Sequence, residues 1–114
     1  PPPRGGGGGG GAAGGVTDVA VLGASGYTGA ELLRLLQLHP HMRVKVLTAD
    51  RSAGKDFADI FPQFRAVEGL PRLVKVEDAA EDIAACGMVF CCLPHGTTHA
   101  IISSLPEHVK VVDL

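Results

Sequence analysis

Short apolar runs alternate with amphipathic segments along most of this chain. Residues 18–22 form an apolar run between glycines, which is typical of a strand that is buried on both faces. Residues 27–38 carry leucines at helical spacing beside charged and polar positions, and Pro40 ends the pattern. Residues 43–48 are rich in β-branched side chains and predict a second strand. Together these segments predict a strand, helix, strand unit with parallel pairing.

The same alternation continues to the end of the chain, with a less regular stretch after the second strand. We expect a short helix over 55–61 that ends at Pro62, and a helix over 77–85 whose first turn holds acidic residues, where the helix dipole favours them. The further predicted elements are a short strand over 73–76, a buried strand over 87–93, a helix over 97–105 and a strand that begins at residue 110. This order predicts an α/β fold, a doubly wound, Rossmann-like parallel sheet that is incomplete at the C-terminus. Its ligand crevice is expected at the carboxyl ends of the strands.

Composition favours one small folded domain behind a tail. Residues 1–16 are mostly glycine, proline and alanine, so we expect a flexible tail there and a folded domain over 17–114. The tail is either the end of an organelle transit peptide or a low-complexity extension. A net charge of -2 and 4% aromatic residues argue against a nucleic-acid partner. No apolar run approaches the roughly 20 residues that cross a bilayer, so we expect a soluble protein with no membrane partner.

Glycines at regular spacing lie between the first strand and the first helix. Gly23 can take the tight turn, Gly26 lets the backbone approach a pyrophosphate, and Gly29 permits close packing of helix on strand. The backbone N–H groups of the first helical turn then face an anion, which predicts a phosphate site; the alternative is a packing turn without a ligand. No Gly-Lys-Ser/Thr follows, which disfavours a P-loop kinase. The candidate cofactor-binding residues here are Gly23, Ser25, Gly26, Tyr27, Thr28 and Gly29.

The segment after the second strand is the place where the adenosine ribose of a dinucleotide normally binds. Asp50 can accept a hydrogen bond from the ribose 2′-OH, which would favour NAD. Arg51 and Ser52 can instead hold a 2′-phosphate, which would favour NADP. We expect NADP, and the alternative for Arg51 is a solvated charged loop.

Three cysteines, an odd number with two of them adjacent, lie in an apolar stretch, which fits a reducing compartment. Cys91 and Cys92 are neighbours in a predicted strand and point to opposite faces, so a zinc site with His95 and His99 is disfavoured. Burial would raise the pKa of a thiol in this stretch, so neither these residues nor Cys86 is assigned as catalytic.

With these motifs in view, the sequence over 19–114 resembles the amino-terminal domain of the N-acetyl-γ-glutamyl-phosphate reductases. The matching segments are residues 23–34, Arg51 with 53–55, residues 93–97 and residues 111–114. The resemblance implies an NADP-dependent oxidoreductase of arginine biosynthesis that reduces N-acetylglutamyl 5-phosphate, a small-molecule acyl phosphate, to N-acetylglutamate 5-semialdehyde. In that chemistry a cysteine thiolate attacks the acyl phosphate, and the resulting thioester accepts hydride from NADPH.

The resemblance also implies that Leu93, Pro94, His95 and Gly96 lie against the cofactor. Their position after a buried strand, at the carboxyl end, agrees with this role, although His95 can also be a simple helix-entry residue. The family's nucleophile, in a Gly-Cys-Tyr-like motif, and its histidine base match no segment of this chain. We therefore expect residues 17–114 to be a partial NADP-binding domain without the catalytic and oligomerisation domain, inactive alone.

Two other functions stay open from sequence alone. One is an aspartate-semialdehyde dehydrogenase, which has related chemistry, although residues 27–28 and 93–97 favour the first family. The other is a nucleotide-sensing module without catalysis. The glycine-rich leader and the biosynthetic resemblance favour a chloroplast location, with the cytoplasm as the alternative, and the full-length protein is expected to form homo-oligomers.

Overall fold

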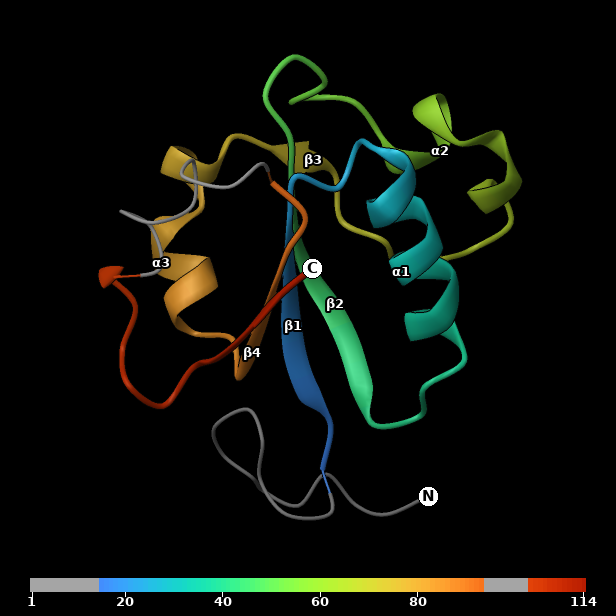
Figure 1. Cartoon of the computed structure of the whole chain (residues 1–114). Coiled ribbons are helices and arrows are strands. Elements are labelled where there is room, and N and C mark those ends of the chain that lie inside the picture. Colours follow the sequence, from blue (N-terminus) through green and yellow to red (C-terminus); the bar gives the residue numbers. More distant parts are fainter. Residues whose placement is uncertain (1–14, 94–102) are drawn as a thin grey trace.

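A computed structural model describes residues 15–93 and 103–114, which form one parallel sheet with helices on both faces (Figure 1). The strands are β1 (Thr17–Leu22), β2 (Met42–Thr48), β3 (Leu73–Val74), β4 (Met88–Cys91) and β5 (Lys110–Asp113). Their order is β3-β2-β1-β4-β5, and all four pairings are parallel. The strand order reverses between β1 and β4, which confirms a doubly wound sheet and places its ligand crevice beyond the carboxyl end of β1.

Helices α1 (Tyr27–Gln37) and α2 (Phe57–Ile60) cover one face of the sheet, and α3 (Ala80–Ala84) covers the other (Figure 1). Two 3-10 turns, η2 (Pro62–Phe64) and η3 (Val76–Asp78), precede or follow the short helices. Within the described residues, no helix has both the length and the apolar character that crossing a membrane requires. The helix expected over 97–105 lies mostly outside the described part of the chain.

β1 is the centre of the core. Val19 and Val21 pack with Leu33 of α1, whereas Ala20 and Leu22 pack with Ile83 of α3. All four of these β1 side chains are fully buried, which confirms the prediction of a strand covered on both faces. The carboxyl end of β1 is thus packed between the two helical layers, and the next segment starts from there.

α1 follows the predicted span closely because its sequence is amphipathic. Leu33 and Leu36 are buried, whereas Arg34 and Leu35 are exposed on the opposite side. The helix ends at Gln37, with Leu38 as the C-cap residue, one residue before the predicted end. The amino end of α1 therefore lies directly after the glycine-containing segment that follows β1.

The short helices differ from their predicted spans. Pro62 does not simply end α2; it begins η2, because the fixed φ of proline suits the first position of a helical turn and its missing N–H is not needed there. The span predicted as one helix over 77–85 is divided at Ala79, whose φ of -114° and ψ of 13° separate η3 from α3. The strand predicted over 73–76 is correspondingly shorter, since Val76 already belongs to η3.

β2 contains an irregularity that changes which face its side chains occupy. Val19 pairs with Val44, but Ala20 pairs with Val46, so Lys45 is an extra residue in β2. As a result Val44 packs on the α1 side and Val46 packs on the α3 side. Strict alternation would put both valines on the same face.

Candidate functional site

The glycine turn, residues 23–29, connects β1 to α1 and crosses the carboxyl edge of the sheet. Gly23 has a φ of +72°, a left-handed conformation that side chains other than glycine rarely adopt. A Cβ at this position would also lie 2.6 Å from Cδ2 of Leu93, so the turn and the segment after β4 are in close contact. Gly23 therefore has the turn-forming role that the sequence predicted.

Gly29 brings the first turn of α1 against the backbone. A Cβ on Gly29 would lie 2.4 Å from the carbonyl oxygen of Ala24, and this backbone atom has no room to move away. The residue is buried, as close packing at this point requires. The prediction that Gly29 permits close packing of α1 at the end of β1 is confirmed.

Gly26 differs from the other two glycines because it faces open space. No described atom lies within 4 Å of the position that its Cβ would take, and its φ of -97° is open to any residue. Gly26 is the N-cap of α1 but provides no side-chain cap, and Tyr27 and Thr28 are exposed beside it. The first N–H groups of a helix have no acceptor within the helix, so the amino end of α1 can donate to an anion that approaches Gly26.

Thr48, the last residue of β2, fixes the start of the glycine turn. Its hydroxyl Oγ1 accepts a hydrogen bond from the backbone N–H of Gly23 at 3.1 Å, and its carbonyl accepts one from Ala24 N–H at 2.8 Å. With 2% exposure, Thr48 is the one buried polar side chain in the described part of the chain. From the sequence alone Thr48 had no assigned role, although a polar residue directly after the apolar pair Val46 and Leu47 is a signal that could have been used.

The segment after β2 forms a series of tight turns at the same sheet edge. Ala53 N–H donates to the carbonyl of Asp50 at 3.3 Å, and Gly54 N–H donates to the carbonyl of Leu73 at 2.6 Å, which ties the segment to β3. Arg51 is exposed, and its guanidinium pairs with no carboxylate among the described residues. Ser52 is half-buried next to it. A cation that has no described partner is available to an anionic ligand.

Of the four residues expected against the cofactor after β4, the structure describes one. Leu93 is half-buried and lies against Gly23. Pro94, His95 and Gly96 lie outside the described residues, so their cofactor contacts stay a prediction. The contact between Leu93 and Gly23 brings this segment to the glycine turn, as the sequence argument from the sheet edge requires.

Cys86 and Cys91 are buried, Cys92 is half-buried, and the pKa of each thiol is raised. Burial, and then the nearby carboxylates of Asp18 and Asp82, raise the pKa of the Cys86 thiol to about 11. Burial is also the main reason why the pKa of Cys91 is raised to about 11 and that of Cys92 is raised as well. Cys91 packs on the α3 side and Cys92 on the α1 side, which confirms that the adjacent cysteines point to opposite faces.

These shifts predict a loss of stability in alkali. An unfolded thiol loses its proton near pH 9, whereas Cys86 and Cys91 keep theirs to about pH 11, so the folded state binds more protons between these values. The free energy of unfolding should therefore fall as pH rises from 9 to 11, by up to about 2 kcal/mol for each thiol. Urea unfolding across this range measures the effect. The double variant Cys86→Ala/Cys91→Ala should show a flatter pH profile, and an equally steep one would contradict the assignment.

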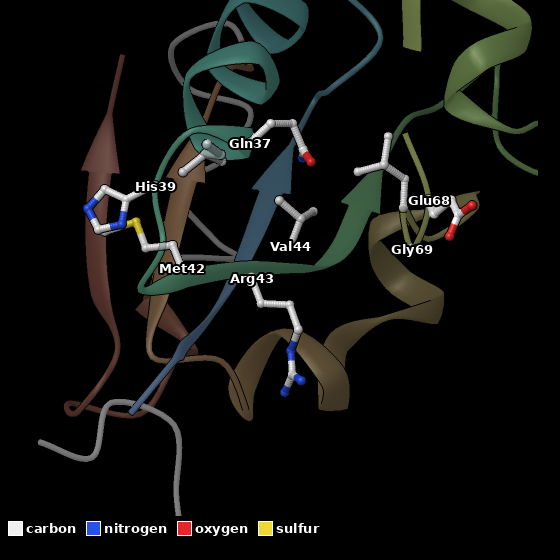
Figure 2. A pocket seen from close by; sticks show the side chains of 9 residues that line it. Gln37, His39, Met42, Arg43, Val44, Glu68 and Gly69 are labelled. Atoms are coloured by element: carbon white, nitrogen blue, oxygen red, sulfur yellow. The ribbon is translucent and has the colours of Figure 1, made fainter. Parts of the chain in front are cut away.

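A hollow lies at the opposite edge of the sheet from the glycine turn. It is formed where α1 ends and β2 begins, and Figure 2 shows Gln37 above the start of β2 and Arg43 below it. Arg43 is already paired with Asp18, with 2.8 Å between guanidinium and carboxylate. This hollow is at the amino end of β2, away from the glycine turn, and offers no cation that is free of a described partner.

The features found here define a dinucleotide-binding domain. They are parallel strands in the order 3-2-1-4-5, a glycine turn that opens into a helix, and an arginine after the second strand that pairs with no described carboxylate. Residues 18–114 match the family described as the NAD-binding domain of semialdehyde dehydrogenases. The chain belongs to this family. The match covers all the elements that build the glycine turn and the loop after β2.

The chain is similar to curated proteins that are named N-acetyl-gamma-glutamyl-phosphate reductase. Over 96 residues the chain is 57% identical to a probable N-acetyl-gamma-glutamyl-phosphate reductase, chloroplastic, of Oryza sativa subsp. japonica, covering 84% of the chain and 22% of the relative. It is 50% identical over 99 residues to an N-acetyl-gamma-glutamyl-phosphate reductase of Cereibacter sphaeroides, covering 87% of the chain and 28% of the relative. The chain thus spans about a quarter of the length of these curated relatives.

A solved structure supports the same fold. The aspartate semialdehyde dehydrogenase of Candida albicans, in a crystal structure with NADP, superposes with a TM-score of 0.67 at 29% identity. The alignment covers 86% of this chain and 29% of that protein. The identity is about half of that found with the rice relative.

Proposed function

We propose that the chain binds NADP(H), with the diphosphate on the glycine turn and the 2′-phosphate on the loop after β2. The observation that carries this proposal is the open space in front of Gly26, where the amino end of α1 faces solvent. Exposed Arg51, with half-buried Ser52 beside it, lies after the neighbouring strand and supports a 2′-phosphate there. The residues proposed to contact the cofactor are Gly23, Ser25, Gly26, Tyr27, Thr28, Gly29, Arg51, Ser52, Leu93, Pro94, His95 and Gly96.

The backbone groups at the glycine turn suit a dinucleotide. The diphosphate needs backbone N–H donors without a Cβ in front of them, and Gly26 leaves that space. When bound, NADPH would supply the hydride for reduction. The chain's own residues would hold the cofactor in place at the switch point of the sheet, and none of the described cysteines has the lowered pKa of a nucleophile.

We further propose that the whole protein is an N-acetyl-γ-glutamyl-phosphate reductase, which reduces an acyl phosphate to the semialdehyde. The support is 57% identity to the rice relative, against 29% to the aspartate semialdehyde dehydrogenase. A protein with the length of the relatives should reduce NADP⁺ when given N-acetylglutamate semialdehyde and phosphate, the reverse reaction. Activity with aspartate semialdehyde instead would favour the rival enzyme, and coenzyme binding with neither activity would favour a nucleotide sensor.

Two further proposals concern the location and the assembly of the protein. The rice and Arabidopsis thaliana relatives are described as chloroplastic, so we propose a chloroplast location for this protein as well. A tagged protein distributed through the cytosol would contradict it. We also propose that the full-length protein forms homo-oligomers, which its mass in solution would test.

The test of the proposed binding site is a comparison of NADPH with NADH. Arg51 pairs with no described carboxylate, so its charge should act on the 2′-phosphate that only NADPH carries. Arg51→Ala should weaken NADPH binding about tenfold to a hundredfold and leave NADH binding unchanged. Fluorescence titration of both coenzymes measures this. Lys75→Ala, which removes an exposed cation from another loop, is the matched control.

Equal, weak binding of NADPH and NADH to the unaltered protein would defeat the 2′-phosphate role of Arg51. An equal loss for both coenzymes in Arg51→Ala would show that this side chain acts on the shape of the loop instead of on the 2′-phosphate.

A further inference from the structure

Thr48 lies where the two proposed cofactor loops meet. The glycine turn begins one residue after β1, and the loop that carries Arg51 begins one residue after β2. Thr48 ends β2, and both its hydroxyl and its carbonyl accept hydrogen bonds from the glycine turn, from Gly23 and Ala24 respectively. On its other side, Ala49 N–H donates to the carbonyl of Val74 in β3 at 2.9 Å.

The hydroxyl of Thr48 is buried, and it accepts a hydrogen bond from Gly23 N–H. At 2% exposure it cannot exchange this partner for bulk water. Valine has the shape of threonine, with a methyl group in place of the hydroxyl. Thr48→Val therefore removes the acceptor for Gly23 N–H at little change in size. Loss of that acceptor leaves a backbone N–H without a partner at a glycine whose conformation is left-handed.

We propose that Thr48 is a positioning residue for the coenzyme: its hydroxyl holds Gly23 so that the glycine turn presents its N–H groups to the diphosphate. This inference rests on the proposed binding of a dinucleotide at that turn. Thr48 touches no part of the coenzyme itself. It acts through Gly23, and because the diphosphate is common to NADPH and NADH, its contribution is the same for both.

The experiment is a set of variants of the whole chain titrated with NADPH and NADH. Thr48→Val should weaken binding of both coenzymes about tenfold, with the ratio of the two dissociation constants unchanged. Thr48→Ser keeps the acceptor and should bind within about twofold of the unaltered protein. Thr17→Val makes the same chemical change at the amino end of β1 and should also bind normally.

Hydrogen exchange gives a readout that general destabilisation would not reproduce. The amide of Gly23 should exchange faster in Thr48→Val, whereas amides of β4, which is separated from β2 by β1, should keep their protection. If Thr48→Val does not fold, Thr48→Ser is compared with Thr48→Cys, which has a similar size but a weak acceptor. The cysteine variant should bind both coenzymes more weakly than the serine variant.

Several outcomes would overturn the proposal. Among them are unaltered affinity in folded Thr48→Val, equal affinities of the serine and cysteine variants, and a loss confined to NADPH. Failure of the proposed function looks different, because the unaltered protein would then bind neither coenzyme. Weak binding in Thr48→Ser as well as Thr48→Val would show that the methyl group matters and would overturn the role of the hydroxyl.

Discussion

Replacement of Gly26 by valine should reduce NADPH affinity by at least about a hundredfold, or about 2.7 kcal/mol, while the domain stays folded. The valine side chain would enter the open space in front of the first turn of α1, where no described atom lies within 4 Å. A diphosphate placed there would lose charge-assisted hydrogen bonds to backbone N–H groups, each worth about 1.5–3 kcal/mol. Isothermal titration with NADPH measures the loss.

The fold should tolerate this valine because the backbone conformation allows it. Gly26 has a φ of -97° and a ψ of 178°, an extended conformation that suits valine, and the change of N-cap residue costs about 1 kcal/mol. Gly26→Ala is the matched control for size and should lose less affinity than Gly26→Val. A valine variant that melts near the unaltered protein and binds NADPH equally well would show that the diphosphate lies elsewhere.

Replacement of Gly29 by alanine should have the opposite pattern, with a large loss of stability. A Cβ here would lie 2.4 Å from the Ala24 carbonyl oxygen, so the start of α1 must move away from the end of β1. Overpacking of this kind costs about 1–3 kcal/mol, and the collision is with backbone, so we expect the upper end of that range. Alanine regains roughly 1 kcal/mol through helix propensity, which leaves a net loss of about 2 kcal/mol. For a domain of this size, that lowers the melting temperature by about 10 °C.

Thermal unfolding followed by circular dichroism measures this loss. Gln37→Ala, an exposed substitution at the far end of α1, is the control for helix propensity and should melt within a few degrees of the unaltered protein. Gly29→Ala with an unchanged melting temperature would mean that the helix can shift at no cost, and that the close contact with Ala24 is not a constraint.

The elements that sequence predicted best are those whose pattern is set by burial. β1 and α1 carry their apolar residues at the periods of a buried strand and of an amphipathic helix, and both were predicted within one residue of their observed bounds. The middle of the chain was harder. Phe57, Phe61 and Phe64 recur at helical spacing, but Pro62 lies between them, and the structure forms two short elements there, α2 and η2. Their rings contact one another in the same core cluster as Leu33 of α1, and these tertiary contacts cannot be read from local spacing.

The candidate site was predictable where glycine itself carries the signal. Gly23 and Gly29 have the turn and packing roles that their spacing indicated. Thr48 was not identified, because threonine is an ordinary strand former and its partner, Gly23, is 25 residues away in sequence. Long-range hydrogen bonds of this kind are decided by strand pairing, and pairing is visible only in the folded sheet.

The extra residue in β2 has a consequence for how this strand can vary. Counted in steps of two from Val44, Val46 and Thr48 would both point toward α1, yet Val46 packs toward α3. The strand therefore consists of two halves with different phase, joined at Lys45. Removal of Lys45 would leave each remaining side chain on its present side, whereas removal of a neighbour would exchange inside for outside in one half. Thr48 accordingly keeps its place beside Gly23 only while the phase of the second half of β2 is preserved.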